Sequence, residues 1–278
     1  MAYGYITERQ NLIRSLAASA FTVTPGPADS TRSRFNDKRM DKVYSCTASG
    51  PGVTIVVDLG SARAVDTVAI LNHNLASFSS AQEISVQGAD DAGITTNVVT
   101  VGTITLSATA TRTKDSCMSF ATTTKRYWQF EFNWASGSNV LTIGELVLGA
   151  ATTLSRGEID GSGESDRISA PQVKLANGGL SAITLTGPVL ERRLAFDDFS
   201  PTEMLFLRTL RRAVAGSVPL LWCDDWTAAS VPAAPTESQQ RCLWGNITEA
   251  DYDETYTNYR LSRPNVLTLL SQGREVGA

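Results

Sequence analysis

The sequence predicts a mostly β fold, in which an N-terminal β-sandwich is followed by a β-rich domain with one packed helix. Short runs of β-branched and aromatic residues follow one another from 53 to 149, with turn residues between them. Almost no helical periodicity interrupts these runs, whereas the second half contains one well-marked amphipathic helix at 201–215. At 278 residues the chain is long for one domain, so we expect two, each with its own core.

The strands of the first half are predicted at 53–60, 66–74, 83–91, 97–110, 126–134 and 141–149. The segment 126–134 gives the clearest pattern, because Trp128, Phe130, Phe132 and Trp134 alternate with Gln129, Glu131 and Asn133. Alternation of this kind puts the aromatic rings on a core face and the polar side chains on the opposite face. Several short strands separated by turns favour a sandwich.

The expected domain boundaries follow from composition. Residues 1–34 are a polar lead-in, 35–152 form the sandwich, 153–170 form a linker, and 171–278 form the second domain. The linker is predicted because its sequence is rich in glycine, serine and charged residues and almost lacks apolar ones.

The second domain contains the best helix signal of the chain. Ser200 is a good N-cap, Pro201 occupies the first helical position, and Glu203 completes a capping box with Ser200. Apolar residues recur at helical spacing as far as Val214, and Gly216 is placed to end the helix. Strands are expected before the helix and at 218–226, followed by a long hairpin at 241–265.

The overall charge argues against several classes of partner. The net charge is −4 and the isoelectric point about 5.2, so the chain has no general attraction for nucleic acid or anionic membranes. No apolar run approaches the roughly 20 residues that span a bilayer, so no membrane insertion is expected. The first ten residues lack the pattern of a secretion signal, which predicts synthesis and assembly in the cytoplasm.

Motifs of enzymes and metal sites are not found. Cys46, Cys117, Cys223 and Cys242 form no CxxC pair, and the sequence contains a single histidine. Glycine-rich phosphate loops and nucleophile elbows are also lacking. We therefore predict a protein that is not an enzyme, with no catalytic residue, cofactor or metal. Cys223 and Cys242 could still come close across neighbouring strands.

The single histidine lies in the stretch LNHNL, directly after a predicted buried strand. Asn72, His73 and Asn74 can all bond backbone groups where a β-ladder stops, and this structural role is the favoured interpretation. Contact with a ligand remains the alternative for these three residues.

Two sets of residues are candidates for a partner interface. Arg208, Arg211 and Arg212 share one side of the predicted helix, where they suit an acidic partner or simply face solvent. Tyrosine and tryptophan are favoured at interfaces but also fill cores. The second half is dense in such residues, and the candidates are Trp222, Trp226, Trp244, Tyr252 and Tyr256.

Segment 35–150 resembles the discoidin-like (coagulation factor 5/8 type C-like) jelly roll, a galactose-binding-like fold. The resemblance rests on FNDKRMDKVYSCT, VTIVVDLGSARAVDTVAI, EISVQGADDAG, RYWQFEF and IGELVLG. ILNHNL together with the last two pieces is similar to the version in tail proteins of long-tailed bacteriophages. In the second half, ERRLAFDDFSPTEMLFLRTLRRAVAGSVPLLWCDDW and LWGNITEADYDETYTNYRLSRPN resemble distal-tail-like proteins with a split β-barrel.

The resemblance implies a structural protein of the virion, located at the tip (baseplate) of a non-contractile phage tail. Its implied partners are the tail tube, hub and tape-measure proteins and further copies of itself. Discoidin-like modules often bind carbohydrate through loops at one end of the sandwich, which makes a receptor- or glycan-binding module the alternative function. Loop 76–82 carries few aromatic or arginine side chains, so docking to a neighbouring protein is as much implied as sugar binding.

Overall fold

The computed structural model confirms a mostly β protein with an N-terminal β-sandwich. It describes residues 3–7, 10–25, 30–37, 42–48, 50–78, 82–106, 115–135, 137–154, 163–167, 172–174, 180–182, 189–196, 220–223, 242–251 and 265–271. The chain divides into two compact units, the first made of Met1–Ser155 and Leu221–Cys242, the second of Arg156–Leu220 and Leu243–Ala278.

The first unit contains most of the described strands. They are β1 (Tyr3–Thr7), β2 (Phe21–Thr24), β3 (Tyr44–Ala48), β4 (Gly52–Leu71), β5 (Gln82–Ala89), β6 (Val99–Leu106), β7 (Ser116–Trp134), β8 (Asn139–Ile143), β9 (Glu145–Gly149) and β10 (Thr152–Leu154), with nearly all of β15 (Leu220–Cys223). Three short 3-10 helices accompany them, η1 (Ala18–Ala20), η2 (Ser30–Asn36) and η3 (Leu75–Ser77).

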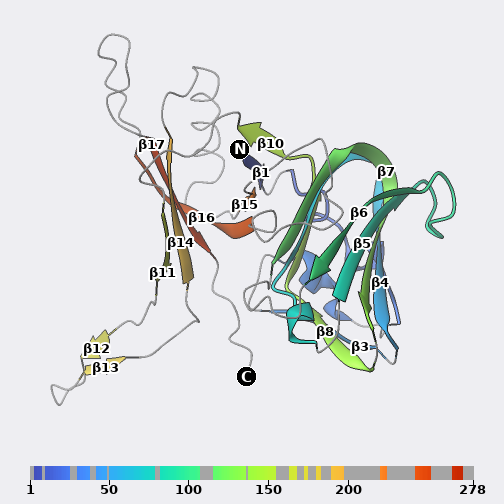
Figure 1. Ribbon diagram of the computed structural model, residues 1–278, viewed down its shortest axis with the longest axis horizontal. Helices are drawn as coiled ribbons and strands as arrows, with labels where there is room; N and C mark the ends of the chain where they lie inside the picture. The colour runs from blue at the N-terminus through green and yellow to red at the C-terminus, as the bar shows by residue number, and fades with distance from the viewer. Residues whose placement is uncertain are drawn as a thin grey trace, which may run out of the picture. The chain divides into compact units, whose positions relative to one another are not determined.

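Two long bent strands, β4 and β7, build both layers of the sandwich (Figure 1). The first half of β4 and the second half of β7 lie in a sheet of order β2-β4-β7-β5-β6. Their other halves pair again beyond a break in register after Asp58, and there β9 pairs with β4 on its free side. A smaller sheet of β3 and β8 completes the sandwich.

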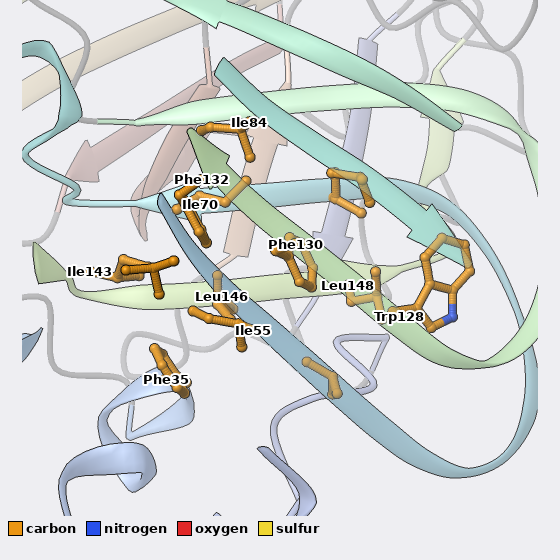
Figure 2. Close-up of a cluster of buried hydrophobic side chains, with 14 of the residues drawn as sticks. Phe35, Ile55, Ile70, Ile84, Trp128, Phe130, Phe132, Ile143, Leu146 and Leu148 are labelled. Atoms are coloured by element: carbon orange, nitrogen blue, oxygen red, sulfur yellow. The ribbon is translucent and has the colours of Figure 1, made fainter. Parts of the chain in front are cut away.

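The core lies between these sheets and follows from the alternation in the sequence (Figure 2). Trp128, Phe130 and Phe132 of β7 point into it, together with Ile55 of β4 and Ile84 of β5. All five side chains are fully buried. The aromatic face that the sequence predicts is therefore the inner face of the first sheet.

The bend in β4 lies where the buried pattern stops. Residues 60–64 are exposed, and Gly60 adopts a φ of +75°, a conformation that favours glycine. After the bend, every residue from Val65 to Leu71 is buried, so both faces of this half are covered. The segments 53–60 and 66–74, expected as two strands, thus belong to one strand that ends at Leu71.

The second unit is described through its backbone pairing. Its strands are β11 (Gly163–Arg167), β12 (Gln172–Lys174), β13 (Leu180–Ala182), β14 (Val189–Phe196), β16 (Cys242–Asp251) and β17 (Asn265–Ser271). Four of them form the antiparallel order β16-β17-β14-β11. Strands β12 and β13 form a separate two-stranded sheet.

Two boundary predictions differ from this arrangement. The expected linker 153–170 contains β11, because a strand at the edge of a sheet can be polar and charged where its pattern suggests a loop. The expected lead-in 1–34 contains β1 and β2, which belong to the first unit. The predicted helix 201–215 lies outside the described residues. In the described part of the chain, no helix is long and apolar enough to cross a membrane.

Candidate ligand-binding face

The LNHNL stretch closes the end of β4. Asn72 adopts a φ of +51°, which asparagine tolerates better than most residues, and its N–H donates to Asp115 Oδ1 at 2.8 Å. His73 Nε2 lies 2.8 Å from Ser116 Oγ at the start of β7. This distance would suit a base and its nucleophile, but both side chains are buried.

Asn74 links the same strand end to β8. Its Nδ2 donates to the carbonyl of Val140 at 2.7 Å, and the N–H of Thr142 donates to its Oδ1 at 2.9 Å. Both ends of the amide are therefore engaged with backbone. The predicted strand-end residues Asn72, His73 and Asn74 lie together, with hydrogen bonds directed into the protein.

Of the predicted interface residues, the structure describes one side chain. Trp222 in β15 is fully buried and stacks on Tyr5, with ring centroids 6.2 Å apart and planes 3° apart. Because the ring is buried, Trp222 offers no surface to a partner. Trp244 belongs to β16, of which only the backbone is described. Arg208, Arg211, Arg212, Trp226, Tyr252 and Tyr256 lie outside the described residues.

A different surface emerges on the other side of the first sheet, which we name the outer face. It is formed by the residues of β2, β4, β7, β5 and β6 that alternate with the buried ones. Strand β7 runs through its middle, and its outward residues are Tyr127, Gln129, Glu131 and Asn133. Cross-strand pairing with β4 and β5 gives each of these residues two neighbours. Asp58 and Ala89 flank Tyr127, and Val56 and Gln87 flank Gln129. Thr54 and Ser85 flank Glu131, and Gly52 and Glu83 flank Asn133.

Tyr127 is distinctive on this face. Among the described side chains it is the only aromatic ring that is not buried. The Arg126 guanidinium lies over the ring, 4.8 Å from its centroid, which is within the range of a cation–π contact. A partly exposed ring beside a cation is a frequent element of binding surfaces.

Arg126 is held in place by Asp58 on the neighbouring strand. Its Nε and Nη2 donate to the two carboxylate oxygens at 2.8 and 2.9 Å, a bidentate geometry. Hydrogen bonds from Arg126, with a further one from the N–H of Gly60, hold the pKa of Asp58 below its ordinary value. Within the described part of the chain Arg126 Nη1 makes no hydrogen bond, so its two N–H donors remain available. We name Asp58, Arg126 and Tyr127 the Tyr127 cluster.

The remaining polar groups along β7 are also available. Gln129, Glu131 and Asn133 make no side-chain hydrogen bond to any other described residue. These side chains differ from Asn74, whose amide is used within the protein. An amide and a carboxylate together supply both donors and acceptors, which is what a ligand rich in hydroxyl groups requires.

The loop 90–98 borders the Tyr127 cluster, because Ala89 pairs with Tyr127. Asp91 accepts hydrogen bonds from the backbone N–H groups of Thr95 and Thr96, and these bonds lower its pKa to about 2. Asp90 accepts from Asn97 Nδ2 at 2.8 Å and from Lys125 Nζ at 3.1 Å. The described residues contain no group of three or more His, Cys, Asp or Glu side chains suited to a metal ion.

Sequence reasoning missed the outer face as a site. The alternation in 126–134 predicts which residues point outward as well as which residues fill the core, but it does not mark the outward ones as a site. The pairing of Arg126 with Asp58 joins residues 68 positions apart, so it depends on strand register. Only the presence of one tyrosine and one arginine at the start of an otherwise polar outward pattern could have pointed to it.

Comparison with solved structures gives matches of low sequence identity. No protein-family model and no curated protein matches the chain. Chitosan-binding module 1 from a chitosanase/glucanase of Paenibacillus sp. IK-5 is 23% identical, with 50% of this chain and 97% of that chain covered and a TM-score of 0.38. CpGH89CBM32-6 from Clostridium perfringens is 16% identical, with 50% and 98% covered and a TM-score of 0.35.

An enzyme chain shows a similar level of likeness. The GH29 fucosidase of Ruminococcus gnavus in complex with fucose is 13% identical, and the TM-score is 0.40. The match covers 52% of this chain and 28% of the fucosidase, so most of that enzyme has no counterpart here. Likeness at this level assigns no ligand and no reaction to the present chain.

Proposed function

We propose that the first unit is a non-catalytic carbohydrate-binding module and that the Tyr127 cluster is its primary contact with sugar. The observation that carries the proposal is a partly exposed tyrosine ring with a guanidinium over it, where a carboxylate on the neighbouring strand holds that guanidinium. The apolar side of a sugar ring packs on an aromatic ring, while its hydroxyl groups bond to planar polar side chains. Strands hold such groups more rigidly than loops do.

A glycan array probed with the full chain tests this proposal. We expect the wild type to bind a subset of glycans, and Tyr127→Ala to lose that binding while keeping the melting temperature. Val140→Ala is the matched control, because this side chain is 47% exposed on β8, outside the outer face. Absence of saturable binding by the wild type would refute the proposed function.

A second candidate function is structural: a component of a phage tail tip that contacts copies of itself and the tail tube, hub and tape-measure proteins. The sheet of β12 and β13 favours it, since this sheet has two strands and three paired residues on each. Isolated hairpins of this size are marginally stable in water and gain stability from a partner surface. Such a protein would be located in the virion after assembly in the host cytoplasm.

Electron microscopy of a phage with this gene disrupted separates the two roles. Missing tails, or tails of abnormal length or tip, would support the assembly role. Complete particles that fail to adsorb would show that the sandwich acts as a receptor-binding device and would contradict the assembly role.

A further inference from the structure

The outer face extends well beyond the Tyr127 cluster. Tyr127, Gln129, Glu131 and Asn133 are successive outward residues of one strand, and at about 3.3 Å per residue they cover roughly 20 Å. That length is much larger than a single sugar ring. The polar groups therefore continue along β7 to the opposite end of the sheet from Tyr127.

The residues that flank these four outward residues of β7 are mostly short, and the four are partly exposed. Gly52 has no side chain beside Asn133, and Ala89 has only a methyl group beside Tyr127. Thr54 and Ser85, on either side of Glu131, are short and carry hydroxyl groups. Among the described residues that pair with this row, the largest apolar side chain is that of Val56.

The outward polar side chains of β7 differ from an ordinary polar surface because their hydrogen-bonding groups are not used within the described part of the protein. Side chains on a sheet commonly bond across strands, as Gln87 does by donating to Thr100 Oγ1 at 3.2 Å. Gln129, Glu131 and Asn133 form no such bond to a described residue. Three consecutive outward positions on the central strand thus present unused donors and acceptors.

The charge of the face limits the ligand. The Asp58 carboxylate is neutralised by Arg126, whereas Glu83 and Glu131 have no Lys or Arg partner among the described residues. A polyanionic chain would meet like charges directly beside the row, which is unfavourable. A neutral or amine-bearing chain would not.

From these observations, and resting on the proposed function, we infer that the module binds an extended, non-anionic oligosaccharide chain laid along β7. The Tyr127 cluster holds one sugar unit, and the row from Gln129 to Asn133 binds the units that follow. The ligand is thus an internal stretch of a polysaccharide and not only a terminal sugar.

Isothermal titration calorimetry of the full chain with oligomers of β-1,4-linked N-acetylglucosamine, and with cello-oligosaccharides, tests this inference. We expect affinity to rise roughly tenfold or more from the disaccharide to the hexasaccharide, as added units contact the row. Asn133→Ala should lower the affinity for the hexasaccharide several-fold and leave the disaccharide unchanged, whereas Tyr127→Ala should weaken both. Val140→Ala should behave as the wild type.

Three outcomes would overturn parts of the proposal, and they are distinguishable. Affinity that is independent of chain length and of Asn133, but lost in Tyr127→Ala, would refute the extended site and leave the proposed function standing. Failure of both oligomer series to bind, together with no saturable binding on the glycan array, would refute the proposed function itself. Oligogalacturonate binding as tightly as the neutral hexasaccharides would refute the exclusion of anionic chains.

Discussion

Glu145 shows how a single residue can determine the pH dependence of stability. It begins β9 opposite Leu71 and is 1% exposed. Burial, followed by the charge of Asp37, raises its pKa to about 9, although Arg14 acts in the opposite direction. At neutral pH the folded protein therefore holds a proton that the unfolded chain releases.

We predict that the free energy of unfolding falls as the pH rises from about 5 to 9, because the folded state binds more protons than the unfolded state over this range. Glu145→Gln should remove most of this slope and stabilise the protein at pH 8 by a few kcal/mol, to order of magnitude. Urea unfolding of the wild type and of Glu145→Gln at several pH values measures this dependence of the free energy of unfolding on pH.

Asp91→Asn provides the control for that experiment. The pKa of Asp91 is about 2, so its titration is complete below the range tested. This substitution should therefore leave the slope between pH 5 and 9 unchanged. An unaltered slope in Glu145→Gln would show that the Glu145 side chain is ionised in the folded protein.

Substitution of Arg126 should affect sugar binding much more than the stability of the protein. Its ion pair with Asp58 is exposed, with 42% and 33% of the two side chains accessible. Such pairs contribute about 0–1 kcal/mol, so Arg126→Ala should change stability little. It should nevertheless weaken sugar binding, and Arg126→Lys should restore that binding only in part because lysine lacks the bidentate fork. Chemical denaturation measures the stability of these variants and calorimetry measures their sugar binding. A loss of stability in Arg126→Ala with unchanged sugar binding would show that Arg126 has a purely structural role.

At the scale of elements, β7 carries both the core and the proposed binding surface. Phe130 is fully buried, whereas Gln129, its neighbour in the chain, points to the outer face. The same alternation of residues thus supports two functions, one on each side of a single strand.

We predict that Phe130→Ala destabilises the protein by about 3–5 kcal/mol, because it opens a cavity in the core. Gln129→Ala on the same strand should lie within about 0.5 kcal/mol of the wild type. Chemical denaturation measures both variants. Equal losses would contradict the assignment of inner and outer faces.

What the sequence predicts and what it does not can be seen in particular elements. Period-2 alternation gives β7 and its inner face correctly, because side chains on a strand alternate whatever the partner strands are. It does not give the joining of 53–60 and 66–74 into β4, since the bend at Gly60 resembles a turn. Nor does it reveal β11, whose charged residues resemble a linker.

The candidate site was less accessible from sequence than the fold. The Asn74 side chain bonds the backbone of β8, whereas Asn72 donates its own backbone N–H to the side chain of Asp115. Both sets of partners are distant in the chain. Trp222 could not be placed, because a tryptophan pattern is the same in a core and at an interface.

At the scale of the whole molecule, the surface proposed for ligand and the surface proposed for assembly belong to different units. The proposed sugar-binding face belongs to the first unit, and the β12–β13 sheet belongs to the second. If several copies assemble, weak binding of sugar by each copy adds up to tight binding of the whole assembly to a glycan surface.

We predict that the full chain self-associates and that deletion of 172–182 reduces this association. The deletion should leave the pairing of β14 with β17 intact, because among the described strands β12 pairs only with β13. Light scattering coupled to size-exclusion chromatography measures the mass of both forms, and circular dichroism checks the β content. Strictly monomeric behaviour of the full chain, alone and with tail proteins, would count against an assembly role.

The location of the bound ligand is the most direct test of the central claim. Amide chemical-shift mapping by NMR, with a neutral oligosaccharide titrated into the isotope-labelled full chain, gives that location. We predict that the largest shifts follow β7 from Tyr127 to Asn133 and the adjacent residues of β4 and β5. Shifts confined to the loops that follow Leu71, with β7 unaffected, would contradict it and return the site to the end of the sandwich.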